Sequence, residues 1–372
     1  MDTYGSFRSV AWSSSRNGAR PQWSCFGRHV AFPEMAVNSI ADLLRSPDFY
    51  PLQIDQQKRS MRFVRMSRAS YRDSVFLDLR LRHMGEILDL KLDDLLLQSG
   101  RLAAEERPVH YILHISFCCS TLLARYFELL PNFFVLKEPR LLAQLAVSRH
   151  LQDIPWDEWF DLTVKLLSRT YDRNEIVVMK PNDWVNPIGC TLLRHNPRAT
   201  STFLMAPLKA YMLSILKSEE RRGWVRERAP KAAADVTLCP QLAGVDPSRL
   251  AVPEAIAYLW LAQRFVCGQM TKEMGDRMVV MSGDDLAQKP RSALQKLTQA
   301  LSLPVEEKTI EWATRQPSVQ RYSKDLSRPY DAESRVQEQN ELERCWGVEV
   351  ETGVAWAAAH GGLDWPGMLT IT

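Results

Sequence analysis

Residues 109–140, VHYILHISFCCSTLLARYFELLPNFFVLKEPR, decide the fold of this 372-residue chain. The run from Val109 to Ile115 is apolar and rich in β-preferring residues, which predicts a buried strand. From Ser120 onward, leucines and aromatic residues recur at helical spacing, so the chain turns sharply from strand into helix. The unpaired N–H groups and the macrodipole at the start of such a helix attract anions. The stretch therefore predicts an anion site between a strand and a helix.

The loop SFCC between this strand and helix contains no glycine. A P-loop nucleotide kinase has a glycine-rich loop, with a lysine where this chain has Ser120. ATP-type phosphotransfer is therefore disfavoured. The adjacent Cys118 and Cys119 are interpreted as small side chains that fill a tight loop, rather than as a redox or metal-binding pair.

Strands and helices continue to alternate after this stretch. We predict buried strands from Ile176 to Met179, ending on Lys180, from Thr200 to Met205, and from Met278 to Met281. Alternation of this kind indicates a parallel sheet with both faces covered. We expect an α/β fold: a three-layer P-loop-type parallel sheet flanked by helices, with a small α+β N-terminal region.

The chain divides into four expected regions. Residues 1–35 are basic and rich in serine without a hydrophobic period, and are expected to be disordered, a transit peptide or a mis-annotated start. Residues 36–104 form the α+β region, with a helix capped by Ser39, an edge strand in MRFVRMS, and a strand followed by a helix in 73–100. Residues 105–335 form the P-loop-type domain, in which the basic segment 219–252 is a possible lid, and residues 336–372 a C-terminal extension.

The composition limits the class of protein. A charged fraction of 24% and a hydrophobic fraction of 45% are typical of a globular domain, and no apolar run is long enough for a membrane span. Seven cysteines without paired or zinc-type spacing favour a reducing, cytoplasmic location and no metal site. The basic residues between 58 and 82 lack interleaved aromatic residues, so a nucleic-acid partner is not expected. They are interpreted as a solvated face or as a site for an acidic group.

The order of these landmarks resembles that of PAPS-dependent sulfotransferases (PAPS is 3′-phosphoadenosine 5′-phosphosulfate). Cys119 to Leu123 fall on the loop-to-helix positions of that family, and PNFFVLKE (131–138) resembles its short strand that ends in a glutamate. MSGDDLAQKPRSALQKLTQALSLP (281–304) follows a later family block closely. The resemblance covers about residues 105–330.

The resemblance implies a site for PAPS as co-substrate, without a metal. Glu138 would be the general base and Lys180 would contact the transferring group. The residues expected to bind the co-substrate are Ser116, Phe117, Cys118, Cys119, Ser120 and Thr121 of the loop, Ser214 at the 3′-phosphate, and Arg321 and Lys324 of the late basic segment RYSKD. Two structural alternatives stay open: a surface Glu138 paired with Lys137 or Arg140, and a Lys180 that merely ends a strand.

Two positions depart from the family pattern. Phe117 stands where the loop usually has a lysine or arginine, and Ala206 stands where an arginine usually accompanies Ser214. We expect a sulfotransferase that moves a sulfuryl group to a hydroxyl or amine of a small-molecule or carbohydrate acceptor. The alternatives are a catalytically inactive P-loop nucleotide- or anion-binding module and a P-loop phosphotransferase. The sequence indicates neither the acceptor nor the oligomeric state.

Overall fold

A computed structural model describes residues 39–81, 85–100, 107–321, 332–365 and 368–369, with the side chains of 332–336 excepted. All of them belong to the unit Val37–Thr372. The expectations for residues 1–35 and for Lys324 fall outside the described residues.

The centre of this unit is a five-stranded sheet in the order β5-β6-β4-β7-β8, in which every neighbouring pair is parallel. The strands are β4 (Val109–His114), β5 (Phe133–Lys137), β6 (Ile176–Lys180), β7 (Thr200–Met205) and β8 (Met278–Ser282). All residues of β4, β5 and β6 are buried. The predicted α/β class is therefore confirmed, and β7 has the predicted bounds.

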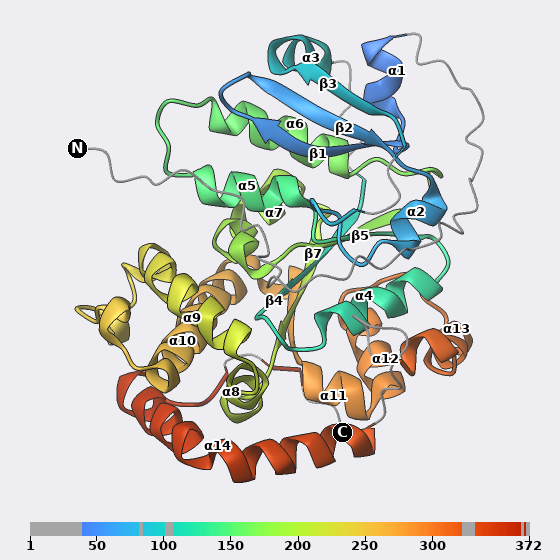
Figure 1. Cartoon of the computed structure of the whole chain (residues 1–372). Coiled ribbons are helices and arrows are strands. Elements are labelled where there is room, and N and C mark those ends of the chain that lie inside the picture. Colours follow the sequence, from blue (N-terminus) through green and yellow to red (C-terminus); the bar gives the residue numbers. More distant parts are fainter. Residues whose placement is uncertain (1–38, 82–84, 101–106, 322–331, 366–367, 370–372) are drawn as a thin grey trace, which may run out of the picture. The chain divides into compact units, whose positions relative to one another are not determined.

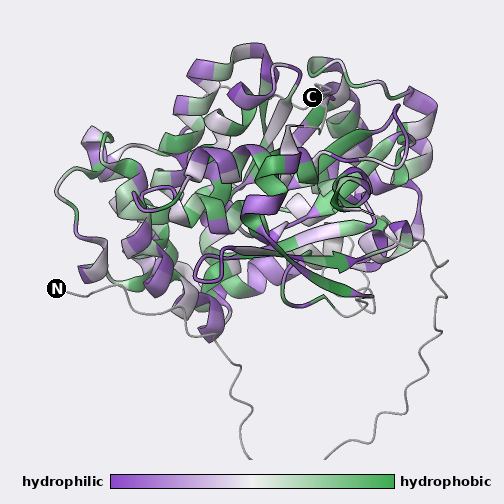
Figure 2. Ribbon diagram, turned by 90° about the horizontal axis from the view of Figure 1, so that it is seen from above, coloured by the Kyte–Doolittle hydropathy of each residue, from purple (hydrophilic) through white to green (hydrophobic). Residues whose placement is uncertain are grey.

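Helices cover both faces of this sheet (Figure 1). The helices between and after the strands are α4 (Ser120–Leu129), α5 (Arg140–Ser148), α6 (Trp156–Leu167), α7 (Gly189–His195), α8 (Leu208–Leu216), α9 (Glu219–Ala232), α10 (Val252–Met274), α11 (Gly283–Gln288), α12 (Pro290–Ala300) and α13 (Glu307–Thr314). The connection through α4 runs across the sheet in the opposite direction to those through α7 and α10. Right-handed crossovers therefore place α4 on one face and α7 and α10 on the other. Green and purple residues alternate along the helices in Figure 2, as expected when one side of a helix packs on a sheet.

A small antiparallel sheet precedes the central one. It has the order β1-β2-β3, from β1 (Phe49–Asp55), β2 (Ser60–Arg65) and β3 (Ile87–Lys91), and is accompanied by α1 (Ile40–Arg45), α2 (Arg68–Asp73) and α3 (Leu92–Ser99). Ser39 caps α1 as predicted, with its hydroxyl accepting from the Asp42 N–H. The prediction of an edge strand in MRFVRMS was wrong, because β2 is the central strand of this sheet. Its alternation reflects one face packed on the core, which central strands of small antiparallel sheets share with edge strands.

The basic segment after α8 begins with a regular helix. Residues 219–232 form α9, and short 3-10 turns occupy much of 233–249. The buried Arg228 of α9 contacts Asp183 (3.4 Å), which joins α9 to the turn after β6. The C-terminal part of the chain forms α14 (Ala332–His360), which is interrupted by non-helical geometry at Trp346. Within the described ranges, no helix combines the length and the apolar character needed to cross a membrane.

Candidate active site

The loop between β4 and α4 takes a strained path without glycine. Phe117 and Cys119 have φ angles of 64° and 65°, in the left-handed region that glycine usually occupies. The Cys118 thiol points inward and donates to the Ile115 carbonyl at 2.7 Å, and burial raises its pKa. A protonated, buried thiol agrees with the packing interpretation of this cysteine pair.

The start of α11 presses directly against this loop. Gly283 follows β8, and a Cβ atom at that position would lie 2.0 Å from the Cys118 carbonyl oxygen. Because Gly283 has no side chain, the start of α11 can lie this close to the loop, at the ends of β4 and β8.

A cavity of about 410 Å³ opens beside the loop. The predicted residues that line it are Ser116, Phe117, Cys118, Cys119, Ser120, Thr121, Glu138, Lys180, Ser214 and Arg321. They come from segments far apart in the sequence, and the carboxyl ends of the parallel strands bring several of them together. Of the predicted site residues, Lys324 falls outside the described part of the chain. Sequence reasoning did not assign Phe76, Arg80, Trp184, Arg221 and Trp224, which also line the cavity.

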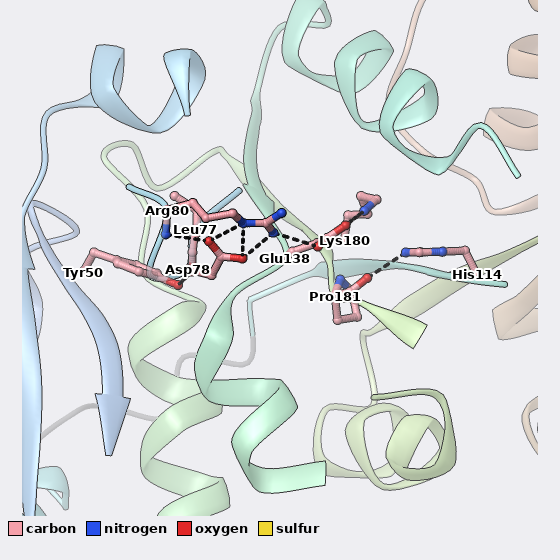
Figure 3. A network of polar contacts seen from close by, with 8 residues as sticks. All are labelled: Tyr50, Leu77, Asp78, Arg80, His114, Glu138, Lys180 and Pro181. Atoms are coloured by element: carbon pink, nitrogen blue, oxygen red, sulfur yellow. Dashed lines mark hydrogen bonds and ion pairs between the residues drawn. The ribbon is translucent and has the colours of Figure 1, made fainter. Parts of the chain in front are cut away.

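Glu138 and Lys180 form an ion pair at adjacent strand ends (Figure 3). Lys180 Nζ lies 2.6 Å from Glu138 Oε1, and the Glu138 N–H donates to the Lys180 carbonyl at 2.6 Å. Glu138 has a φ of 53°, which turns it off the end of β5. The Lys180 side chain is 1% exposed and that of Glu138 17%. Lys137, the suggested surface partner of Glu138, instead pairs with Glu128.

The N-terminal region supplies an arginine to the same pair. Leu77 donates its N–H to the Lys137 carbonyl at 2.7 Å and accepts from the Arg140 N–H at 3.2 Å, so this segment is attached to the end of β5. Arg80 then lies over the Phe76 ring, 3.9 Å from its centroid, and its guanidinium is 3.8 Å from Glu138 Oε2. Figure 3 shows Arg80 between Asp78 and Glu138. The basic composition of 58–82 was the available signal, but it did not single out Arg80.

His114 lies behind the ion pair at the end of β4. It is 4% exposed, and each ring nitrogen lies 2.9 Å from a main-chain carbonyl oxygen, of Ile115 or Pro181. Burial, and next the charge of Lys180, lower its pKa to about 4. His114 is therefore neutral near pH 7 and supports the loop, as expected for a buried, hydrogen-bonded histidine.

The opposite side of the cavity is formed by α8, α9 and α14. Ser214 and Lys217 come from the end of α8, and Lys217 pairs with Glu338 of α14 at 2.9 Å. The guanidinium of Arg221 lies 4.6 Å from the Phe117 ring centroid. Ala206 is buried, and its carbonyl accepts from Trp260 Nε1 at 2.8 Å. No cation therefore reaches the cavity from position 206.

The described part of the chain contains no cluster of potential metal ligands. Among those residues, no group of three or more histidine, cysteine or acidic side chains could hold a metal ion. The cavity does contain positively charged side chains, and Lys180 and Arg221 are two of them.

No protein-family model and no curated protein sequence matches this chain. Solved structures do match. The sulfotransferase domain from the curacin biosynthetic pathway has a TM-score of 0.37 and 12% identity, over 65% of this chain and 98% of that one. A sulfotransferase from Alicyclobacillus acidocaldarius has a TM-score of 0.34 and 14% identity, over 68% and 95%.

A sulfotransferase from Mycobacterium avium is also similar, with a TM-score of 0.35 and 12% identity over 70% of this chain and 84% of that one. Each of these three structures is of a sulfotransferase or of a sulfotransferase domain. Their TM-scores are low, so the function proposed below rests on the sequence motifs and the geometry of the cavity.

Proposed function

We propose that this protein is a sulfotransferase that moves a sulfuryl group from PAPS to a hydroxyl or amine of a small-molecule or carbohydrate acceptor. One observation carries the proposal. A carboxylate and a buried lysine, Glu138 and Lys180, meet at 2.6 Å in the same cavity as the start of α4, where unpaired N–H groups suit an anion. Transfer of a sulfuryl group needs this set: a cradle for the donor anion, a base, and a cation at the reacting centre.

The proposed step uses each group once. The loop 116–121 and the start of α4 hold the phosphosulfate of the donor. The acceptor oxygen or nitrogen forms a bond to sulfur, and its proton passes to Glu138. The bond from sulfur to the bridging phosphate oxygen breaks, and the electron pair stays on that oxygen as adenosine 3′,5′-bisphosphate leaves. The ammonium of Lys180 stabilises this developing charge.

Glu138 and Lys180 are paired with each other. Each therefore keeps a compensating charge within the mostly buried site. Both members of the pair also line the cavity. A lysine that merely ended a strand would not need a partner that faces a cavity, so the arrangement favours roles as base and stabiliser.

The first test is calorimetric titration of adenosine 3′,5′-bisphosphate into the protein without metal. We expect saturable, one-site binding. In a second step, Glu138→Gln should lower sulfuryl transfer to a responsive acceptor by about 100-fold or more, the usual contribution of a general base. Affinity for the bisphosphate should change by only a few-fold. Equal loss of turnover and of nucleotide binding would show that Glu138 holds the site together rather than taking a proton.

A non-catalytic anion-binding module is the second candidate. Phe117 and Ala206 favour it, because both replace cations expected from the resemblance, and the buried Ala206 offers none. Binding of the bisphosphate without transfer to any acceptor in a broad screen, with Glu138→Gln behaving like the wild type, would select this function.

A further inference from the structure

The positive charges of the cavity differ in how they are neutralised. The cationic side chains that line it are Arg80, Lys180, Lys217, Arg221 and Arg321. Three of them have carboxylate partners: Arg80 with Asp78, Lys180 with Glu138, and Lys217 with Glu338. For Arg221, no carboxylate of the described residues lies within 4.0 Å. Its charge is therefore available to an anion that enters the cavity.

Arg221 also differs from the other arginines of α9. Arg222 and Arg226 both pair with Glu219, and Arg228 pairs with Asp183. Arg221 instead donates to the Ser214 main-chain carbonyl and stacks on Phe117. Phe117 is itself packed edge-to-face against Trp224, with ring centroids 5.5 Å apart. These contacts hold the guanidinium in place beside the loop.

The contacts of Arg221 do not use all of its hydrogen-bond donors. A guanidinium has five N–H donors, more than its contacts with the Ser214 carbonyl and the Phe117 ring can occupy. One donor is bonded to Ser214. The remaining planar donors suit the oxygens of a phosphate group, which guanidinium groups bind by paired hydrogen bonds.

Arg221 lies between the two positions at which the resemblance leads us to expect cations. It touches Phe117, which replaces the cation of the loop, and Ser214, whose usual arginine partner is replaced by Ala206. We propose that Arg221 supplies the missing charge from α9 and binds the 3′-phosphate of the donor nucleotide beside Ser214. The proposal rests on the proposed function, and it identifies α9 as the element that makes the site selective for a nucleoside bisphosphate.

The test compares two nucleotides and two adjacent arginines. Adenosine 3′,5′-bisphosphate and adenosine 5′-phosphate are titrated calorimetrically into the wild type, Arg221→Ala and Arg222→Ala. Arg222 is the matched control, because it is the next residue of α9 but contacts Trp346 and Glu219 rather than the cavity. We expect Arg221→Ala to weaken the bisphosphate by about 10- to 100-fold, as for loss of a charge-assisted phosphate contact. The affinity for the monophosphate should change by no more than about 2-fold. Arg222→Ala should bind both nucleotides as the wild type does.

Three results would overturn the assignment. If Arg221→Ala binds the bisphosphate as tightly as the wild type does, Arg221 is not the 3′-phosphate ligand, although the proposed function stands. If Arg221→Ala lowers the affinity for both nucleotides equally, or if Arg222→Ala lowers the affinity for the bisphosphate as much, the effect comes from the general positive charge of α9. If the wild type binds neither nucleotide, the proposed function fails and this inference fails with it. Arg221→Gln, which retains polarity on the helix surface, replaces the alanine variant if thermal unfolding shows that the latter is not folded.

Discussion

At the scale of single residues, the loop after β4 shows how a sequence without glycine adopts a conformation that glycine favours. Cys119 has φ 65° and ψ 17° and directly precedes α4. Left-handed geometry costs a residue with a side chain about 1 kcal/mol, and a β-branched residue more. The surrounding contacts must supply this energy, which is the usual situation of strain at a functional site.

This strain predicts an order of stabilities at position 119. Cys119→Gly should unfold at the same or higher denaturant concentration than the wild type, and Cys119→Val should be less stable than Cys119→Gly by about 1–2 kcal/mol. Chemical denaturation measures the difference. The same two substitutions at the exposed, helical Cys345 are the control. There glycine should be the less stable variant, because helices disfavour glycine more than valine. Valine equal to glycine at position 119 would contradict the left-handed geometry.

At the scale of secondary structure, the parallel strands could be predicted because burial on both faces makes them continuous apolar runs. The strand Thr200–Met205 has the bounds expected from its residues. The small sheet was less predictable. In β3 the exposed and partly buried residues alternate, and the segment LDLKLDDLLL continues into α3 without a break in composition. Whether a short strand is central or at an edge depends on its partners, which its own residues do not specify.

The contact of α11 with the loop predicts a strong effect of one methyl group. In Gly283→Ala the new Cβ would meet the Cys118 carbonyl oxygen at 2.0 Å, and main-chain atoms of a tight loop cannot move aside cheaply. We expect a loss of stability of about 1–3 kcal/mol. On the proposed function, affinity for adenosine 3′,5′-bisphosphate should also fall, because the loop after β4 shifts.

Gly223 of α9 provides the matched control for that prediction. A Cβ at Gly223 meets nothing within 4 Å, and the residue lies inside a helix. Gly223→Ala should therefore raise stability by about 0.5–1 kcal/mol and leave nucleotide binding unchanged. Urea unfolding and calorimetry of the two variants check both effects. A Gly283→Ala protein as stable as Gly223→Ala would contradict the close contact of α11 with the loop.

At the scale of the whole molecule, the cavity is assembled from segments that no local pattern connects. The sequence could indicate that Glu138 and Lys180 lie at one site, because they stand at the ends of neighbouring strands of a recognisable sheet. Arg80 could not, because its place depends on hydrogen bonds between Leu77 and the end of β5. Arg221 could be noted as basic, but its contact with Phe117 exists only when α9 packs beside the loop. Motifs therefore singled out Glu138 and Lys180, whereas tertiary packing determined which cations surround them.

Acid stability is the global property that the buried histidines control. His110 of β4 is fully buried, and its ring nitrogens lie 3.0 Å from the hydroxyls of Thr200 and Thr202, which satisfy a neutral imidazole. Burial lowers the pKa of His110 to about 3, and that of His114 is lowered to about 4. In the unfolded chain both titrate near pH 6.5. Between about pH 6 and pH 4 the unfolded state therefore binds more protons than the native state, and the free energy of unfolding falls as the pH falls.

The size of this effect can be measured with one substitution. Each such histidine contributes a slope of up to about 1.4 kcal/mol per pH unit. We expect His110→Asn, whose amide can bond the same threonines but does not titrate, to reduce the slope between pH 5.5 and pH 4.5 by about that amount, whatever its stability at pH 7. Urea unfolding at intervals across pH 7 to pH 4.5 gives both slopes. His150→Asn is the control, because it removes an imidazole that is exposed on the surface rather than buried in β4. Parallel curves for the wild type and His110→Asn would show that His110 is already protonated in the native state, against the burial that β4 imposes on it.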